Sequence, residues 1–226
     1  MNDSDGIGGS GRESVAALYK YDYWIKQNQK HIPAHYRLRK SANIINAMAG
    51  RKEQELLDVG CGPATLMRLL RSNIHYYGID IAIQSPAPNL IQSDVVEEPI
   101  RFEDKSFDIV TALGVFEYVS SRQDDKLGEI AELLGERGRF VVTYTNFGHR
   151  DRRMFEAFSN VQPLDNFRRN LAHHFVIDKC FPTSYNWHGG QPVQEWLKVA
   201  NMHVKANIPI AGPKLAVEYF FICTRR

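Results

Sequence analysis

Short apolar runs alternate along the chain with segments whose apolar residues recur every three or four positions. Apolar runs bounded by glycine, proline or aspartate are typical of buried strands, and the longer spacing is typical of helices. Strands that alternate with helices predict an α/β fold with a parallel sheet and helices on both faces. The expected strands are Glu55–Val59, Ile74–Ile81, Asn89–Gln92, Phe107–Leu113 and Gly138–Thr145, and the expected helices between them are Ala64–Arg71 and Asp124–Leu134.

The two ends of the chain depart from this alternation. Residues 1–12 are rich in glycine and serine and predict a flexible tail. Apolar and aromatic residues then recur at helical spacing over Glu13–Gln29 and Pro33–Met48, so two helices are expected before the first strand. Near the other end, two β-rich runs flank residues 211–213, which predicts a terminal hairpin. Such a hairpin would give the sheet an antiparallel C-terminal strand.

Composition and charge are those of one folded domain. The chain has 226 residues, of which 43% are hydrophobic and 24% are charged, and its formal net charge is +2. A chain of this length can bury one continuous core, so residues 13–226 are predicted to form a single domain. No apolar run approaches the roughly 20 residues that span a bilayer, and so small a charge does not indicate nucleic acid. Three scattered cysteines without metal-ligand spacing favour a reducing compartment, the cytoplasm.

The segment LLDVGCGPAT, residues 56–65, joins a buried strand to a turn that contains two glycines. Gly60 and Gly62 permit a tight turn and a close approach of the backbone to a ligand. Asp58 stands just before them, where its charge disfavours a phosphate and suits a cation or an amino group. Ligands of open α/β sheets bind at the carboxyl ends of the strands, so this turn is a candidate ligand site. The alternative is that both glycines only shape the turn.

Acidic residues also follow the next two strands. The segment HYYGIDIA supplies Asp80 at the end of the next strand, where a carboxylate can accept hydrogen bonds from both hydroxyls of a ribose. The alternative is that Asp80 caps a helix. Asp94 follows the third strand, with an exposed loop acid or a helix N-cap as its alternative role. The fourth strand ends at Leu113 on the same edge, so these residues predict an acid-rich pocket for a cationic nucleoside.

This ordered set resembles the glycine-rich and acidic motifs of class I S-adenosylmethionine-dependent methyltransferases, over roughly residues 53–145. The resemblance implies a Rossmann-like, seven-stranded, mostly parallel sheet with extra N-terminal helices, and S-adenosylmethionine as the cofactor. It implies that Asp80 binds the ribose and that Asp94 with Val95 contacts the adenine. The cofactor-binding residues that it implies are Asp58, Gly60, Cys61, Gly62, Asp80, Ile81, Asp94, Val95 and Leu113.

Methyl transfer from a sulfonium requires an aligned acceptor, and a general base only where the acceptor must lose a proton. Tyr144 and His149 are the candidate catalytic residues, with structural hydrogen bonding as the alternative for His149. For Glu117, a solvent-facing or structural role is the alternative to catalysis. Residues 13–50 are expected to form a helical lid, and residues 147–190 a substrate-region insertion. The candidate substrate contacts, for which packing is the alternative, are Tyr118, Asn146, Tyr185 and His188.

Three functions compete at this point. The first is methyl transfer to a small-molecule acceptor. The second is a cofactor-binding regulatory or partner subunit of a metabolic enzyme, because TNFGHRDRR and YNWHGGQPVQEWLKVANMHV are similar to part of the MetW-like proteins. The third, a nicotinamide-dependent oxidoreductase, is disfavoured by Thr65, which stands where a third glycine would be. The expected partner is a small-molecule substrate, with neither nucleic acid nor membrane, and a homodimer is one assembly that the sequence allows.

Overall fold

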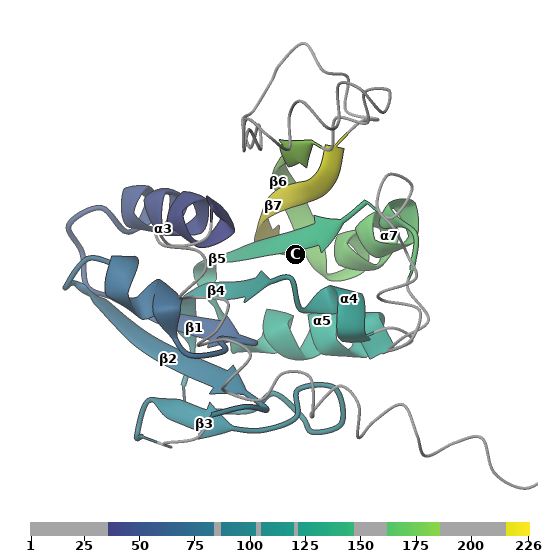
Figure 1. Cartoon of the computed structure of the whole chain (residues 1–226). Coiled ribbons are helices and arrows are strands. Elements are labelled where there is room, and N and C mark those ends of the chain that lie inside the picture. The colour runs from purple at the N-terminus through teal and green to yellow at the C-terminus, as the bar shows by residue number, and fades with distance from the viewer. Residues whose placement is uncertain (1–35, 84–86, 103–104, 120–121, 147–161, 186–215) are drawn as a thin grey trace, which may run out of the picture.

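The computed structural model describes seven strands and five helical segments (Figure 1). The residues that it describes are 36–83, 87–102, 105–119, 122–146, 162–185 and 216–226. The strands are β1 (Gln54–Val59), β2 (Ile74–Asp80), β3 (Leu90–Gln92), β4 (Phe107–Leu113), β5 (Leu134–Thr145), β6 (Phe175–Tyr185) and β7 (Ala216–Arg225). The helical segments are α3 (Tyr36–Ala49), the 3-10 helix η1 (Thr65–Leu69), α4 (Phe116–Val119), α5 (Gln123–Leu133) and α7 (Leu164–His174).

The strands form one sheet in the order β3-β2-β1-β4-β5-β7-β6. Strands β1 to β5 all run parallel to one another. Strand β7 lies between β5 and β6 and runs antiparallel to both. The prediction of a seven-stranded, mostly parallel sheet with an antiparallel C-terminal strand is therefore confirmed. Because β1 to β5 share one direction, their carboxyl ends meet along one edge of the sheet.

Successive residues of the central strands point to opposite faces and bury two separate cores. Leu57 of β1 and Val110 of β4 pack with side chains of α5 and α7 on one face. Their neighbours Leu56 and Ile109 pack with α3 and η1 on the other face. A strand that is covered on both sides needs apolar residues at consecutive positions, which is why these strands appear in the sequence as continuous apolar runs.

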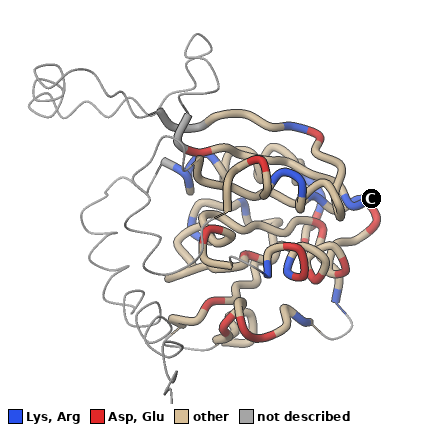
Figure 2. Tube along the Cα trace, turned by 90° about the vertical axis from the view of Figure 1, so that its right-hand side faces the viewer, with Lys and Arg blue, Asp and Glu red and all other residues tan. Residues whose placement is uncertain are grey.

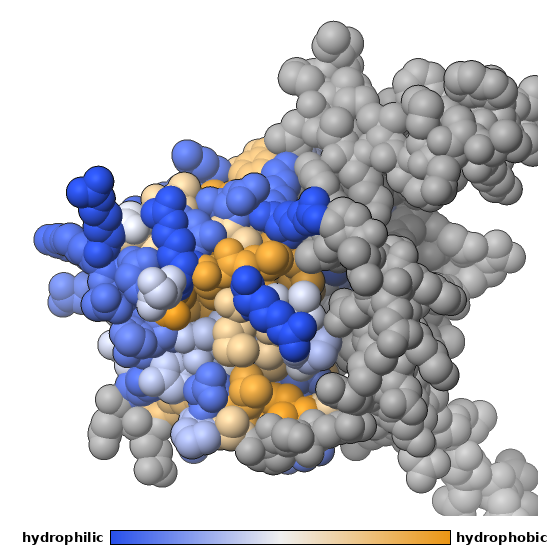
Figure 3. All heavy atoms as spheres, turned by 60° about the vertical axis from the view of Figure 1, so that its left-hand side comes forward, coloured by the Kyte–Doolittle hydropathy of each residue, from blue (hydrophilic) through white to orange (hydrophobic). Residues whose placement is uncertain are grey.

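The surface of the described residues is mixed in charge and in hydropathy. Figure 2 shows Lys and Arg interspersed with Asp and Glu along the chain trace. Figure 3, which brings the side of α3 and η1 forward, shows apolar side chains that reach the surface between polar ones. Within the described residues, the exposed large apolar side chains are Met67, Ile91 and Val176. None of the described helices has the length and apolar character that crossing a membrane requires.

The helical segment after β1 is shorter than the sequence predicts. An α-helix over Ala64–Arg71 was expected, but the chain forms the 3-10 helix η1 instead. Ala64 takes a left-handed conformation with φ 53° before this segment, and Leu70 is extended after it. A bond from the N–H of Ile74 to the carbonyl of Arg71 then turns the chain into β2. The α-helix prediction is therefore wrong, because these two residues leave room for only about one helical turn.

Helix α7 and strand β6 lie within residues 147–190, the segment expected to be a substrate-region insertion. Phe167 and Leu171 are fully buried, which anchors α7 to the sheet. Strand β6 is the outer partner of β7, so both edges of β7 are already paired with β6 and β5. The turn and the first run of the hairpin expected around residues 211–213 lie outside the described residues, and the partners of β7 in the sheet are β5 and β6. Residues 1–35, which include the expected tail and the first helix, lie outside the described residues.

Replacement of Phe167 by Ala tests the packing of α7. The Phe167 ring stacks on the Tyr144 ring, with 4.1 Å between their centroids, and contacts Phe221 edge-on at 5.7 Å. The cavity left by Phe167→Ala should lower the free energy of unfolding by about 3 to 5 kcal/mol, measured by urea denaturation. The exposed residue Arg168 on the same helix provides the control, since Arg168→Ala should change the free energy of unfolding by no more than about 0.5 kcal/mol. Equal effects of the two substitutions would contradict this packing.

Candidate functional site

The turn after β1 adopts a backbone conformation that depends on its glycines. Gly60 and Gly62 have φ values of 70° and 52°, a region that side chains disfavour. The N–H groups of Gly60 and Cys61 both donate to the carbonyl of Ile79, at 2.8 and 3.2 Å, which ties the turn to β2. A Cβ atom on Gly60 would lie 2.3 Å from a methyl carbon of Val115. Glycine is therefore favoured at position 60 for two reasons: its φ is positive, and Val115 after β4 leaves no room for a side chain.

The carboxylate of Asp80, at the end of β2, joins two turns. One oxygen accepts the N–H of Gly62 and the other accepts the N–H of Ala82, each at 2.8 Å. The side chain is only 8% exposed. Burial raises the pKa of Asp80, and the two N–H groups oppose that rise. A carboxylate oxygen can accept two hydrogen bonds. Asp80 can therefore keep its bonds to the two turns and bind a diol at the same time.

Asp58 is buried in β1, just before the turn, and bonds to the strands on both sides. The hydroxyl of Tyr76 in β2 donates to one oxygen at 2.8 Å, and the hydroxyl of Thr111 in β4 donates to the other at 2.7 Å. Burial raises the pKa of Asp58 to about 6, opposed by both hydroxyls and reinforced by the charge of Asp80. Asp58 therefore links three central strands through its own side chain.

Three further predicted residues line the same edge of the sheet. Cys61 is buried, with its Sγ 3.6 Å from the carbonyl oxygen of Gly62. Burial and the nearby carboxylates raise the pKa of its thiol, which keeps the thiol neutral. Ile81 and Leu113 are half-buried at the ends of β2 and β4. Cys61 and Leu113 pack in the core on the α3 face of the sheet.

Asp94 begins the turn that follows β3. Its Oδ1 accepts the N–H groups of Val96 and Glu97, at 2.9 and 3.4 Å. Its backbone carbonyl accepts the N–H groups of Glu97 and Glu98. Asp94 is half-buried, and its Oδ1 is bonded within the turn, whereas none of the described residues donates to its Oδ2. Val95 is half-buried and packs against the core on the α5 face, so this turn presents an acceptor oxygen beside an apolar side chain.

A partly buried ion pair near the ends of β4 and β5 carries no signal in the sequence. Arg37 of α3 donates to the carboxylate of Glu218 in β7. A Cβ on Gly114, which has φ 77°, would lie 2.4 Å from the Arg37 guanidinium. Burial alone would lower the pKa of Arg37, but the carboxylates of Glu218 and Glu117 raise it above its ordinary value. The pair joins residues 181 positions apart, so no local spacing signals it.

Glu117 and Tyr144 take structural positions within the described residues. One oxygen of Glu117 accepts the N–H and the hydroxyl of Thr145, at 2.9 and 2.8 Å, and the side chain is 2% exposed. The Tyr144 hydroxyl donates to the carbonyl of Gln162 at 2.7 Å. Burial raises the pKa of Tyr144, which opposes its use as a base. Together with the stacking of the Tyr144 ring on Phe167, these hydrogen bonds hold both side chains within the protein.

The remaining acceptor-side candidates are only partly placed. Tyr118 lies half-buried on α4, and Asn146 lies half-buried directly after β5. Tyr185 ends β6, opposite Ala216 of β7. His149 and His188 lie outside the described residues. The structure therefore brings Tyr118 and Asn146 to the carboxyl side of the sheet and leaves both histidines as predictions.

The chemistry of this edge suits a ligand with hydroxyl groups, amino groups or positive charge. Carboxylates from Asp58, Asp80 and Asp94 stand at or near the ends of three neighbouring strands. Their charges would repel a phosphate at this edge and attract a cation. Within the described residues, no three His, Cys, Asp or Glu side chains are arranged to hold a metal ion.

Comparison with families and solved structures agrees with this geometry. A family model described as a methyltransferase domain matches residues 34–190. No curated protein matches the sequence. A TehB-like SAM-dependent methyltransferase from Corynebacterium glutamicum superimposes with a TM-score of 0.60 and 14% identity, over 95% of this chain and 100% of that chain.

Two further solved structures have similar folds. A chain of the complex between the Haloferax volcanii Trm112 methyltransferase activator and the putative methyltransferase gives a TM-score of 0.62 at 16% identity, over 91% of this chain and 95% of that chain. The N-methyltransferase NodS from Bradyrhizobium japonicum, in complex with S-adenosyl-L-homocysteine, gives 0.55 at 9% identity, over 83% and 85%. At such identities the likeness shows the fold alone.

The buried position of Asp58 predicts a pH-dependent stability. The unfolded chain releases the Asp58 proton near pH 3.8, whereas the folded protein keeps it up to about pH 6. Between these values the folded state binds more protons, so the free energy of unfolding falls as the pH rises. A shift of about two units corresponds to about 3 kcal/mol.

Asp58→Asn removes this titration and keeps the shape, because both hydroxyls accept hydrogen bonds as well as donate them. The difference in unfolding free energy, wild type minus variant, should fall by about 2 to 3 kcal/mol between pH 4 and pH 6.5. Urea denaturation across this pH range measures it. A difference that stays constant with pH would show that Asp58 has an ordinary pKa in the folded protein.

Proposed function

Because the chain belongs to the methyltransferase-domain family, we propose that it transfers the methyl group of S-adenosylmethionine to a small-molecule acceptor. The observation that carries the proposal is the Asp80 carboxylate, which is buried at the end of β2 and fixed by the N–H groups of Gly62 and Ala82. A carboxylate held in one orientation at a strand end, with acceptor capacity to spare, suits the two hydroxyls of a ribose.

The other residues of the edge fit the remaining parts of such a cofactor. The Oδ2 atom of Asp94 suits an exocyclic amino group, and Val95 beside it suits the face of an adenine. In the turn of Gly60 and Gly62, the absence of side chains lets the backbone approach the amino-acid portion of the cofactor. The nearby carboxylates of Asp58 and Asp80 favour the positive charge of that portion. The cofactor supplies a methyl group that its sulfonium has already activated.

The chain itself must orient the acceptor and exclude water. Tyr118 and Asn146 lie on the carboxyl side of the sheet and are proposed to contact the acceptor, together with Tyr185 and His188. His149 is the proposed base for an acceptor that must lose a proton. Deprotonation of the buried Tyr144 hydroxyl would be costly, because burial raises its pKa, so Tyr144 supports the site rather than removing a proton.

A small acceptor is supported by the charge of the chain. The formal net charge is +2, and both signs are interspersed over the described residues (Figure 2). Proteins that bind nucleic acid gather positive charge on one face, because each phosphate contact needs a nearby cation. A face of one sign would be expected for such a polyanionic substrate.

Calorimetric titration with S-adenosylhomocysteine tests the cofactor assignment. Binding is expected for this nucleoside, and no binding for NAD at the same concentrations. Asp80→Ala should weaken the affinity by about 1 to 3 kcal/mol, because charge-assisted hydrogen bonds are lost. Asp125→Ala, an exposed acid on α5, is the matched control and should leave the affinity unchanged. Binding of NAD alone, or equal affinities for the Asp80 variant and wild type, would contradict the assignment.

Transfer of an isotopically labelled methyl group tests the acceptor class. The protein is incubated with labelled S-adenosylmethionine and a cell extract, which is then separated into small molecules, RNA and protein. Label should accumulate in the small-molecule fraction and depend on Asp80. Label confined to the RNA or the protein fraction would refute the small-molecule proposal while leaving methyl transfer intact.

A further inference from the structure

A buried lysine on α5 holds the backbone of the segment that follows β3. Lys126 is only 1% exposed, and its Nζ donates to the carbonyl of Glu98 at 2.7 Å. The same Nζ pairs with both carboxylate oxygens of Glu129, at 3.0 and 2.9 Å. Glu129 in turn accepts the N–H of Ile100 at 2.9 Å. The ion pair therefore holds one carbonyl and one N–H of residues 98–100.

A second cation, Arg122, lies immediately before α5 and bonds the residues that precede Glu98. The Nη1 atom of Arg122 donates to the carbonyl of Val96 at 2.6 Å and to that of Glu97 at 3.3 Å. Three consecutive carbonyls, those of residues 96–98, thus accept hydrogen bonds from two positive side chains, one on α5 and one immediately before it. Hydrogen bonds with Arg122, Lys126 and Glu129 thus hold the segment from Val96 to Ile100 against α5 and its N-terminal end.

The hydrophobic effect does not explain a lysine at this position. Its neighbours along the helix face, Leu127 and Ile130, are fully buried apolar residues. Burial of an ammonium group is costly unless it is paired and hydrogen-bonded, and a well-packed apolar residue often gives equal or greater stability. What the lysine adds over an apolar side chain is a fixed position for the carbonyl that it binds.

We propose that Lys126, Glu129 and Arg122 form a clamp that positions residues 94–100 for recognition of the 6-amino group of the cofactor's adenine. This inference rests on the proposed cofactor function. The clamp acts through the turn that Asp94 begins. At the start of this turn Asp94 accepts the N–H of Val96, and at its end Arg122 and Lys126 bind the carbonyls of residues 96 and 98. With both ends fixed, Asp94 Oδ2 and the Val95 side chain keep one orientation. The three residues are positioning residues, since none is placed to touch the base.

The test compares S-adenosylhomocysteine with S-inosylhomocysteine, in which an oxygen replaces the 6-amino group. Wild-type protein should prefer the adenosine compound in calorimetric titration. Arg122→Ala and Lys126→Met should each weaken the binding of S-adenosylhomocysteine by about tenfold. They should weaken the binding of S-inosylhomocysteine less, so that the preference for the adenosine compound falls. Arg122→Lys retains a donor and should recover most of the preference. If these side chains only stabilise the fold in general, their replacement would weaken the binding of both compounds by the same factor.

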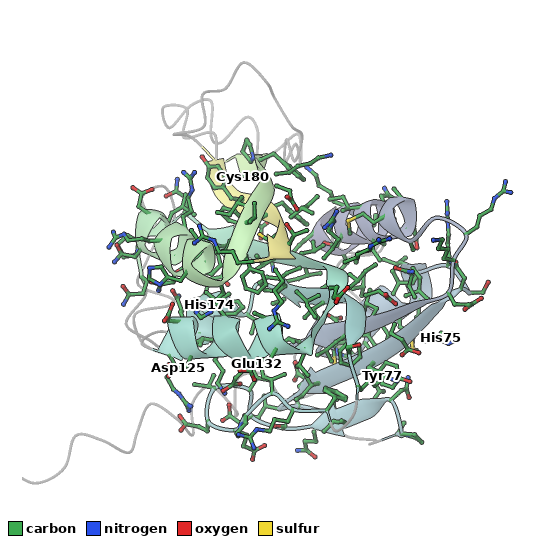
Figure 4. The ribbon with its side chains drawn as sticks, turned by 180° about the vertical axis from the view of Figure 1, so that it is seen from behind. His75, Tyr77, Asp125, Glu132, His174 and Cys180 are labelled. Carbon is green, nitrogen blue, oxygen red and sulfur yellow. The ribbon has the colours of Figure 1, made fainter. Side chains whose placement is uncertain are left out.

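Glu132→Gln provides the matched control on the same helix. Glu132 and Asp125 both lie on α5 (Figure 4), and both are exposed. This variant should keep the wild-type affinity for both compounds. Urea denaturation checks that each variant is folded, and Arg122→Ala, whose side chain is only half-buried, carries the test if Lys126→Met does not fold.

The outcomes separate the two proposals. Unchanged preference in both folded variants, or an equal loss of affinity for both compounds, would overturn the clamp while leaving the cofactor assignment intact. Failure of the wild-type protein to bind S-adenosylhomocysteine would overturn the proposed function, and the clamp with it. Hydrogen exchange that speeds up at the amides of residues 96–98 and 100 in the variants, and not in the central strands, would support the clamp directly.

Discussion

The geometry of the site depends on one carboxylate that two backbone turns share. Asp80 accepts the N–H of Gly62 from the turn after β1 and the N–H of Ala82 from the turn after β2. Both turns are thereby fixed relative to the strands that lead into them. Asp58 adds a second connection, since its oxygens accept hydroxyls from β2 and β4. Two buried acids thus set the positions of the groups that a nucleoside would meet.

Most of the sheet could be predicted because a strand covered on both faces must be apolar throughout. The segments around Leu57 and Val110 carry this signal. Strand β6 does not, since its sequence FVIDKCFPTSY includes charged residues and a proline and lies at the edge of the sheet. Helix α7 did carry a signal, because Phe167 and Leu171 are four positions apart. That signal was too short to stand out from the surrounding polar residues.

The candidate site was predictable in its residue types and unpredictable in its contacts. Glycines and an acid at a strand end follow from local chemistry, so the positions of Asp80 and Gly62 could be expected. The partners of Asp58 could not, because Thr111 lies 53 positions away and meets it only through the order of the strands. The same holds for Arg122 and Lys126, the two cations that bind the segment after β3, because their backbone partners lie 25 to 28 positions away in the sequence.

A crystal structure of the protein in complex with S-adenosylhomocysteine tests the central claim most directly. The account predicts that the ribose hydroxyls bond to the Asp80 carboxylate while Gly62 and Ala82 keep their own bonds to it. It also predicts the adenine beside Val95. A nucleoside bound away from the carboxyl ends of β1 and β2, or an Asp80 side chain that bonds only to protein in the complex, would contradict it.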